Sequence, residues 1–77
     1  MDKITLADCK LNKIYRVVEV AGELKFRRRL LDFGFINCDV KVLHTSSLRG
    51  NFLVQIRGYV LAIRRAQASA VFVAEKI

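Results

Sequence analysis

The stretch Phe52-Leu-Val-Gln-Ile-Arg-Gly-Tyr-Val-Leu-Ala-Ile63 decides the fold, because two short runs of strand-forming residues meet there at a single glycine. In the first run, Phe52, Val54 and Ile56 recur at every second position, which is the period of a strand with one face partly in water. The second run, from Tyr59 to Ile63, is apolar throughout. Since only Arg57 and Gly58 separate the runs, the stretch predicts a tight antiparallel hairpin.

Three further strands and one helix are predicted around this hairpin. Residues 14–20, 40–44 and 71–75 are short runs rich in β-branched residues, and each favours a strand. From Glu23 to Phe33 the apolar residues follow helical spacing, and Gly34 supplies the left-handed conformation that ends a helix. Five short strands, one inserted helix and no βαβ rhythm predict a small, mostly antiparallel barrel formed by a single domain over residues 1–77.

Local patterns add detail to this outline. The sequence indicates one helical turn over residues 5–8 with Thr5 as its N-cap, and a second short turn within residues 64–69. In the first strand we place Ile14, Val18 and Val20 on one side and the alternate residues on the other. Residues 45–51 are rich in turn formers and are expected to form a connecting loop.

Composition limits the classes of protein to which this chain can belong. Its 77 residues carry 14 Lys and Arg against 7 Asp and Glu, a net charge of +7, and 53% of them are hydrophobic. This apolar fraction excludes a disordered basic tail, and no apolar run approaches the roughly 20 residues that span a bilayer. Two cysteines do not form a secreted disulfide framework, so we expect a cytoplasmic protein with reduced thiols.

Groups able to carry catalysis or bind a metal are few. His44 is the single histidine, and Cys38 lies six residues before it, on the same face of an extended strand but about 20 Å away at about 3.3 Å per residue. Zinc ligands usually come as close pairs, which Cys9, Cys38 and His44 do not form. We therefore expect no enzyme, no cofactor and no metal site, with one buried thiol and one surface imidazole.

Basic residues form the first candidate binding feature. Lys25-Phe-Arg-Arg-Arg29 lies on the predicted helix, and Arg49, Arg57, Arg64 and Arg65 surround the later strands. These cations could contact the phosphates of a nucleic acid. Alternatively, Arg28 and Arg29 pair with Asp32 one turn away, and the other arginines solvate the barrel rim. Few aromatic residues are interleaved with the charges, which disfavours nucleic acid.

Apolar residues around Gly34 form the second feature. A chain of this size cannot readily enclose all of its hydrophobic residues, so some should stay exposed and mark a contact site. For Leu31 and Phe33, packing inside the barrel is an open alternative. Phe35 follows the helix end directly and is expected at the surface.

Two segments carry a resemblance to a known family. Arg29-Leu-Leu-Asp-Phe-Gly-Phe35 and Arg57-Gly-Tyr-Val-Leu-Ala-Ile-Arg64 resemble the FeoA family of small ferrous-iron transport proteins. The matching positions are Arg29, Leu30, Asp32, Gly34, Phe35, Val40, Val42, Gly58, Leu61, Ala62, Arg64, Ala68, Val71 and Val73. The departures, such as Asn37-Cys38 in place of a proline and glycine, fall at turns.

The resemblance implies a five-stranded SH3-like barrel that acts with FeoB, a membrane transporter of ferrous iron with a cytosolic GTPase domain. It implies no catalytic or metal-ligand set. We expect a non-enzymatic accessory protein, cytoplasmic or recruited to the inner face of the membrane through the transporter, and self-association stays possible. The expected contact residues are Arg27, Arg28, Arg29, Leu31, Phe33, Phe35 and Arg49.

Two other hypotheses follow from the charge and the fold. One is a basic barrel that binds nucleic acid. The other is a metal-regulator domain, because iron-dependent repressors carry a similar barrel. A complete repressor is excluded, since 77 residues leave no room for a helix-turn-helix domain.

Overall fold

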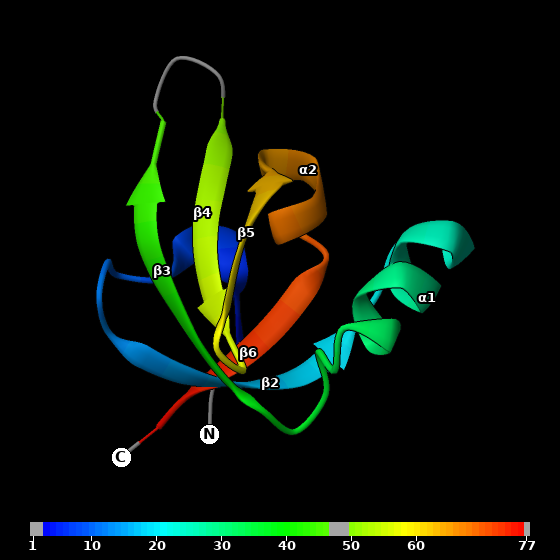
Figure 1. Ribbon diagram of the computed structural model, residues 1–77, viewed down its shortest axis with the longest axis horizontal. Coiled ribbons are helices and arrows are strands. Elements are labelled where there is room, and N and C mark those ends of the chain that lie inside the picture. Colours follow the sequence, from blue (N-terminus) through cyan, green and yellow to red (C-terminus); the bar gives the residue numbers. More distant parts are fainter. Residues whose placement is uncertain (1–2, 47–49, 77) are drawn as a thin grey trace.

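The computed structural model describes residues 3–46 and 50–76. In chain order its elements are β1 (Ile4–Thr5), the 3-10 helix η1 (Leu6–Asp8), β2 (Ile14–Val20), α1 (Leu24–Asp32), β3 (Asp39–Thr45), β4 (Asn51–Ile56), β5 (Tyr59–Arg64), α2 (Arg65–Ala68) and β6 (Val71–Glu75). Figure 1 shows β2 and β6 crossing β3, β4 and β5 in a strongly curved sheet, with α1 standing to one side. The predicted mostly β, SH3-like fold with one inserted helix is confirmed.

All neighbouring strands pair antiparallel, in the order β1-β6-β2-β3-β4-β5. Over residues 3–46 and 50–76 the sheet therefore has six strands, one more than the five predicted. The additional strand, β1, has only two residues and is defined by its pairing with β6, Ile4 opposite Val73 and Thr5 opposite Phe72. A two-residue strand has no alternation of its own for a sequence pattern to reveal.

The predicted faces of β2 are wrong because the strand contains a β-bulge. Its pairing with β6 shifts register between Val17 and Glu19, so Val18 is an extra residue. Tyr15 and Val17 are buried before the bulge and Val20 after it. Ile14, which was expected to share a side with Val20, is instead 44% exposed.

The hairpin between β4 and β5 is confirmed. Six consecutive residue pairs join the strands without a register shift, from Asn51 opposite Arg64 to Ile56 opposite Tyr59. Its two loop residues, Arg57 and Gly58, both have positive φ, at 48° and 81°. A type I′ turn requires positive φ at both central positions, and this turn suits the natural twist of paired strands.

The core lies inside the curved sheet. It is formed by Leu6, Tyr15, Val17, Val20, Leu30, Phe35, Cys38, Val40, Val42, Phe52, Val54, Ile56, Ile63, Ala68, Val71 and Val73.

The two predicted helical turns are present as η1 and α2. The Thr5 hydroxyl, however, donates a hydrogen bond to the Asp8 carboxylate at 3.1 Å and does not cap η1 by accepting one from a backbone N–H group. Helix α1 contributes only Leu30 to the fully buried set. Most of α1 is therefore exposed to water.

Candidate docking surface

Helix α1 presents a cluster of exposed basic side chains. Arg27, Arg28 and Arg29 are exposed, as is Lys25. The ion pairs that the structure shows within residues 3–46 and 50–76 are Lys3–Glu19, Lys13–Glu75, Arg16–Asp39 and Lys76–Asp39. None of them involves α1, so the alternative in which Arg28 and Arg29 pair with Asp32 is not observed among those residues. The helix therefore keeps its positive charge available.

Apolar side chains interrupt this cationic surface. Leu31 is 44% exposed and Phe33 is 40% exposed, and Leu24 at the start of the helix is 60% exposed. The alternative in which Leu31 and Phe33 pack inside the barrel is therefore excluded. Phenylalanine and arginine are enriched in protein interfaces, so exposed Phe33 beside the arginines is typical of a contact surface.

Phe35 is fully buried, so the prediction that it lies at the surface is wrong. Helix α1 ends in a Schellman motif: the Phe35 N–H donates to the Leu30 carbonyl at 3.0 Å, and the Gly34 N–H donates to the Leu31 carbonyl at 2.9 Å. Gly34 has a φ of 88°, which turns the chain back toward the barrel. This motif commonly packs the residue after the glycine against the residue five positions earlier, here Leu30.

The side chain of Arg57 fixes this turn from the β4–β5 hairpin. Its Nε donates a hydrogen bond to the Gly34 carbonyl at 3.2 Å. A β-carbon placed on Gly34 would lie 2.6 Å from that Nε and 2.9 Å from Cδ. Gly34 is therefore required both for its backbone conformation and for the close approach of Arg57.

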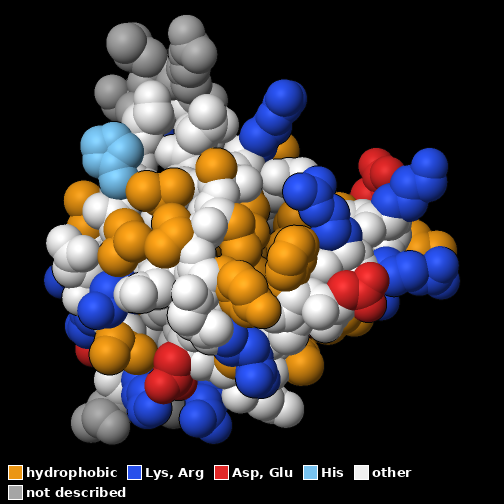
Figure 2. Space-filling view, viewed as in Figure 1, with side chains coloured by type: hydrophobic (Ala, Val, Ile, Leu, Met, Phe, Trp, Pro, Cys, Tyr) orange, Lys and Arg blue, Asp and Glu red, His pale blue; other side chains and the backbone are white. Residues whose placement is uncertain are grey.

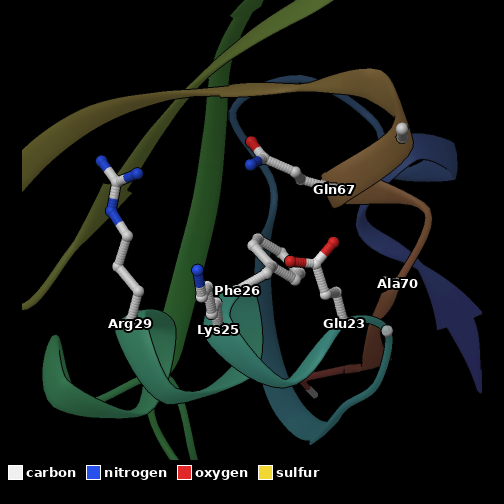
Figure 3. Close-up of a pocket in the computed structure, with 8 residues that line it drawn as sticks. Glu23, Lys25, Phe26, Arg29, Gln67 and Ala70 are labelled. Atoms are coloured by element: carbon white, nitrogen blue, oxygen red, sulfur yellow. The ribbon is translucent and has the colours of Figure 1, made fainter.

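A cleft separates α1 from α2. It has a volume of about 410 Å³, and Phe26, half-buried, lies at its base. Figure 3 shows Lys25 and Arg29 rising from α1 on one side and Gln67 pointing in from α2 on the other. Gln67 is held there because its Oε1 accepts a hydrogen bond from the Arg64 backbone N–H at 3.0 Å. The cleft joins an apolar base to a mainly cationic rim.

Sequence reasoning missed the cleft. Phe26 is one of the apolar residues at helical spacing between Glu23 and Phe33, and Gln67 falls in the short turn predicted within residues 64–69. Their meeting depends on how two helices far apart in the sequence are placed, which no local pattern encodes. Arg49, another predicted contact residue, lies outside the described residues.

The two cysteines and the histidine differ in burial. Cys38 is buried and His44 is exposed, which confirms the expected thiol and imidazole. They do not share a sheet face as expected, since the pairing of β3 with β4 shifts register between Val42 and His44. Burial raises the pKa of the Cys9 thiol to about 12, with a smaller contribution from Asp8. Burial also raises the pKa of Cys38, against a partly opposing effect of Arg57.

Groups of three potential metal ligands are likewise missing from the described part of the chain, counting His, Cys, Asp and Glu. Over the same residues, the helices are too short and too polar for any of them to cross a bilayer.

Comparison with solved structures identifies the fold. The FeoA protein of Chlorobium tepidum, solved by NMR, superposes with a TM-score of 0.89 at 31% identity, covering 96% of this chain and 71% of that one. A FeoA-like protein of Clostridium acetobutylicum gives a TM-score of 0.85 at 20% identity over 100% of this chain and 91% of that one. A manganese-dependent transcriptional repressor in complex with manganese gives 0.89 at 17% identity, over 99% of this chain but 38% of its own length.

No curated protein matches the chain in sequence. The likeness to the repressor shows a shared fold alone, because its identity to this chain is low. At the family level the assignment is direct, since the FeoA domain model matches residues 4–75. Together with the 31% identity to the Chlorobium protein, that match shows that this chain belongs to the FeoA family.

Proposed function

We propose that this protein is a non-enzymatic accessory module of ferrous iron uptake that docks on the cytosolic GTPase-bearing region of the FeoB transporter and modulates its assembly or activity. Membership of the FeoA family supports the role in iron uptake. Docking would bring the protein to the inner face of the membrane through its partner, without an ion or cofactor of its own.

The exposed cationic face of α1 carries this proposal. Four basic side chains lie within one helix of nine residues, and the charge of the whole chain is +7. Such a surface attracts an acidic partner over a Debye length of about 8 Å at physiological ionic strength. The arginines would raise the rate of association, and binding should weaken as salt is added.

Apolar contact would supply most of the lasting affinity. Leu31 lies within about one turn of the three arginines, Phe33 lies about one turn after Arg29, and both are exposed. Covering them with a partner removes apolar surface from water, which is favourable by roughly 25 cal/mol per Å². Phe35 has no part in this contact because it is buried. The contact set that we propose is therefore Arg27, Arg28, Arg29, Leu31 and Phe33.

The direct test is a titration of the purified cytosolic region of FeoB with the wild-type protein and with the variant Arg28→Glu/Phe33→Ala. We expect the double variant to bind at least tenfold more weakly, about 1.4 kcal/mol. Lys10→Glu is the matched control: it makes the same change of charge on an exposed residue in the loop before β2, on the opposite side of the barrel from α1 (Figure 1).

Unchanged binding by the folded double variant would remove α1 as the contact. If Lys10→Glu weakened binding to FeoB equally, net charge alone would explain the effect, and the contact would not be specific to α1. No binding by the wild-type protein would refute docking on FeoB.

A further inference from the structure

β5 is the last strand in the order of the sheet, so its outer edge has no strand paired with it among the described residues. Within residues 3–46 and 50–76, β5 pairs with β4 and with no other strand. Its six residues run without a bulge, whereas the opposite edge, β1, has only two. An open strand edge exposes a row of backbone N–H and C=O groups that can pair with another chain.

Proline and bulges, which protect many such edges, are missing from β5, and its one charged residue is Arg64 at its end. Proteins block edges with proline, bulges, charged residues or short strands, or by covering the edge with a helix or loop. The run from Tyr59 to Ile63 contains no proline and no charge, and Tyr59 and Val60 are 58% and 53% exposed. Figure 2 shows hydrophobic side chains gathered over this part of the molecule, between β4 and α1, with lysines and arginines around them. Phe26 and Arg29 of α1 line a small cavity with Leu61, Ala62 and Ile63, and Arg64 ends the strand, so the open apolar part of the edge is at Tyr59 and Val60.

Charge around the edge indicates what it would pair with. Arg57 precedes β5, and Arg64 and Arg65 lie at its other end. Arg29 of α1 lines a small cavity of about 40 Å³ with Leu61, beside the same strand. A complementary segment therefore needs an apolar centre and acidic residues at both ends.

A second copy of this chain fits the edge poorly. Antiparallel pairing of two β5 strands would bring Arg57 of each copy toward Arg64 and Arg65 of the other, and each copy carries a net charge of +7. Like charges placed opposite one another in a sheet are destabilising. The charge pattern favours an acidic partner over self-association.

We propose that the outer edge of β5 binds an extended polypeptide segment, with a β-branched apolar centre flanked by aspartate or glutamate, as a seventh strand of the sheet. Backbone hydrogen bonds would hold the segment, and the flanking arginines would fix its ends. This inference goes beyond the docking role of α1, because it concerns a different surface and does not depend on which protein supplies the segment.

Synthetic peptides test strand addition directly. The first peptide has a Val-Thr-Val-Thr-Val centre with two acidic residues at each end, and two relatives carry N-methyl groups on alternate sets of its central amides. Only one set of amides in an added strand faces β5, so one methylated peptide should lose at least tenfold in affinity while the other binds within about threefold of the parent. Binding is followed by NMR titration. Hydrogen exchange of the backbone amides of Tyr59–Arg64 is measured with and without the peptide, and we expect the peptide to slow it.

Two variants of the protein locate the contact. Val60→Glu places a negative charge on the edge strand, and Gln55→Glu places one on its cross-strand neighbour in β4, one strand further from the edge. Both residues are exposed, so both variants should fold. We expect Val60→Glu to weaken binding of the parent peptide at least tenfold and Gln55→Glu to weaken it much less.

Equal behaviour of the two methylated peptides would overturn the proposal, because side-chain docking would then explain binding. Failure of every peptide to shift β5 resonances would overturn it as well. A dimer by light scattering with β5 amides protected in the free protein would assign the edge to a second copy instead. None of these results bears on binding of α1 to FeoB, so the two proposals can fail separately.

Discussion

Replacing Gly34 with alanine tests the turn that ends α1 and holds Phe33 at the surface. Two effects add at this position. Gly34 has a φ of 88°, where a residue with a β-carbon costs about 1–2 kcal/mol, partly offset by about 0.4–1 kcal/mol from a less flexible unfolded chain. The new β-carbon would also lie 2.6 Å from Arg57 Nε. Because Arg57 is flexible it would move away and lose its hydrogen bond to the Gly34 carbonyl, which costs about 1 kcal/mol.

The expected loss of unfolding free energy for Gly34→Ala is therefore about 2 kcal/mol. In a domain of this size each kcal/mol lowers Tm by roughly 4–8 °C. Gly58→Ala is the matched control, since Gly58 has a similar φ of 81° but a β-carbon there would meet no other atom within 4 Å. Its cost should be the backbone part alone, about 1 kcal/mol. Urea unfolding at constant m-value measures both.

Repeating Gly34→Ala in an Arg57→Ala background completes the test. With the arginine side chain gone, the cost of Gly34→Ala should fall to that of Gly58→Ala. Equal costs for the two glycine variants in the wild-type background, or a cost at Gly34 that does not change when Arg57 is removed, would refute the assigned role of the Arg57 contact.

Three further outcomes follow from the same structure. Phe35→Ala should lower stability by about 3–5 kcal/mol by opening a cavity, and the same change at exposed Phe33 should cost far less, as thermal unfolding can show. The raised pKa of Cys9, about 12, keeps its thiol protonated, so alkylation of the folded protein should be slow at pH 8 and become fast in guanidinium. The hydrogen bond from Lys76 lowers the pKa of Asp39, so the stability it contributes is present above the ordinary pKa of an aspartate and is lost as the pH falls below it. Asp39→Asn should therefore flatten the pH dependence of the urea midpoint on the acid side of that ordinary pKa, and an unchanged slope would contradict the pairing.

The elements predicted correctly are those that a few neighbouring residues determine. Alternation over Phe52–Ile56 and the glycine after Arg57 are sufficient for the β4–β5 hairpin, and helical spacing followed by Gly34 is sufficient for α1. The bulge at Val18 and the strand β1 were not predicted, because each exists only through its pairing with β6.

The candidate contact surface was predicted in part for the same reason. Exposure of Arg28 follows from the helical wheel, which places it opposite Phe26 and Leu30, whereas Arg29 lies one turn after Phe26 at the border of the apolar side. Phe35 was misplaced although the signal was available, since a Schellman glycine predicts a contact between the following residue and the one five positions before it. The cleft against α2 was beyond sequence reasoning, because the position of Gln67 is set by the whole barrel between the two helices.

The two proposed contacts lie on either side of the same part of the molecule. Phe26, Arg29 and Leu61 line one small cavity, so α1 and β5 flank a common apolar seam that the sheet leaves open at its long edge. A partner with an acidic surface for α1 and an extended segment for β5 could engage both at once, and each weak contact would then raise the effective concentration of the other. Such a partner would also give a use to side chains that the isolated barrel leaves in water. Helix α1 places only Leu30 among its buried residues, while Leu24 and Leu31 of the helix and Phe33 directly after it are exposed. Burying those side chains inside would have strengthened the domain and removed its contact surface.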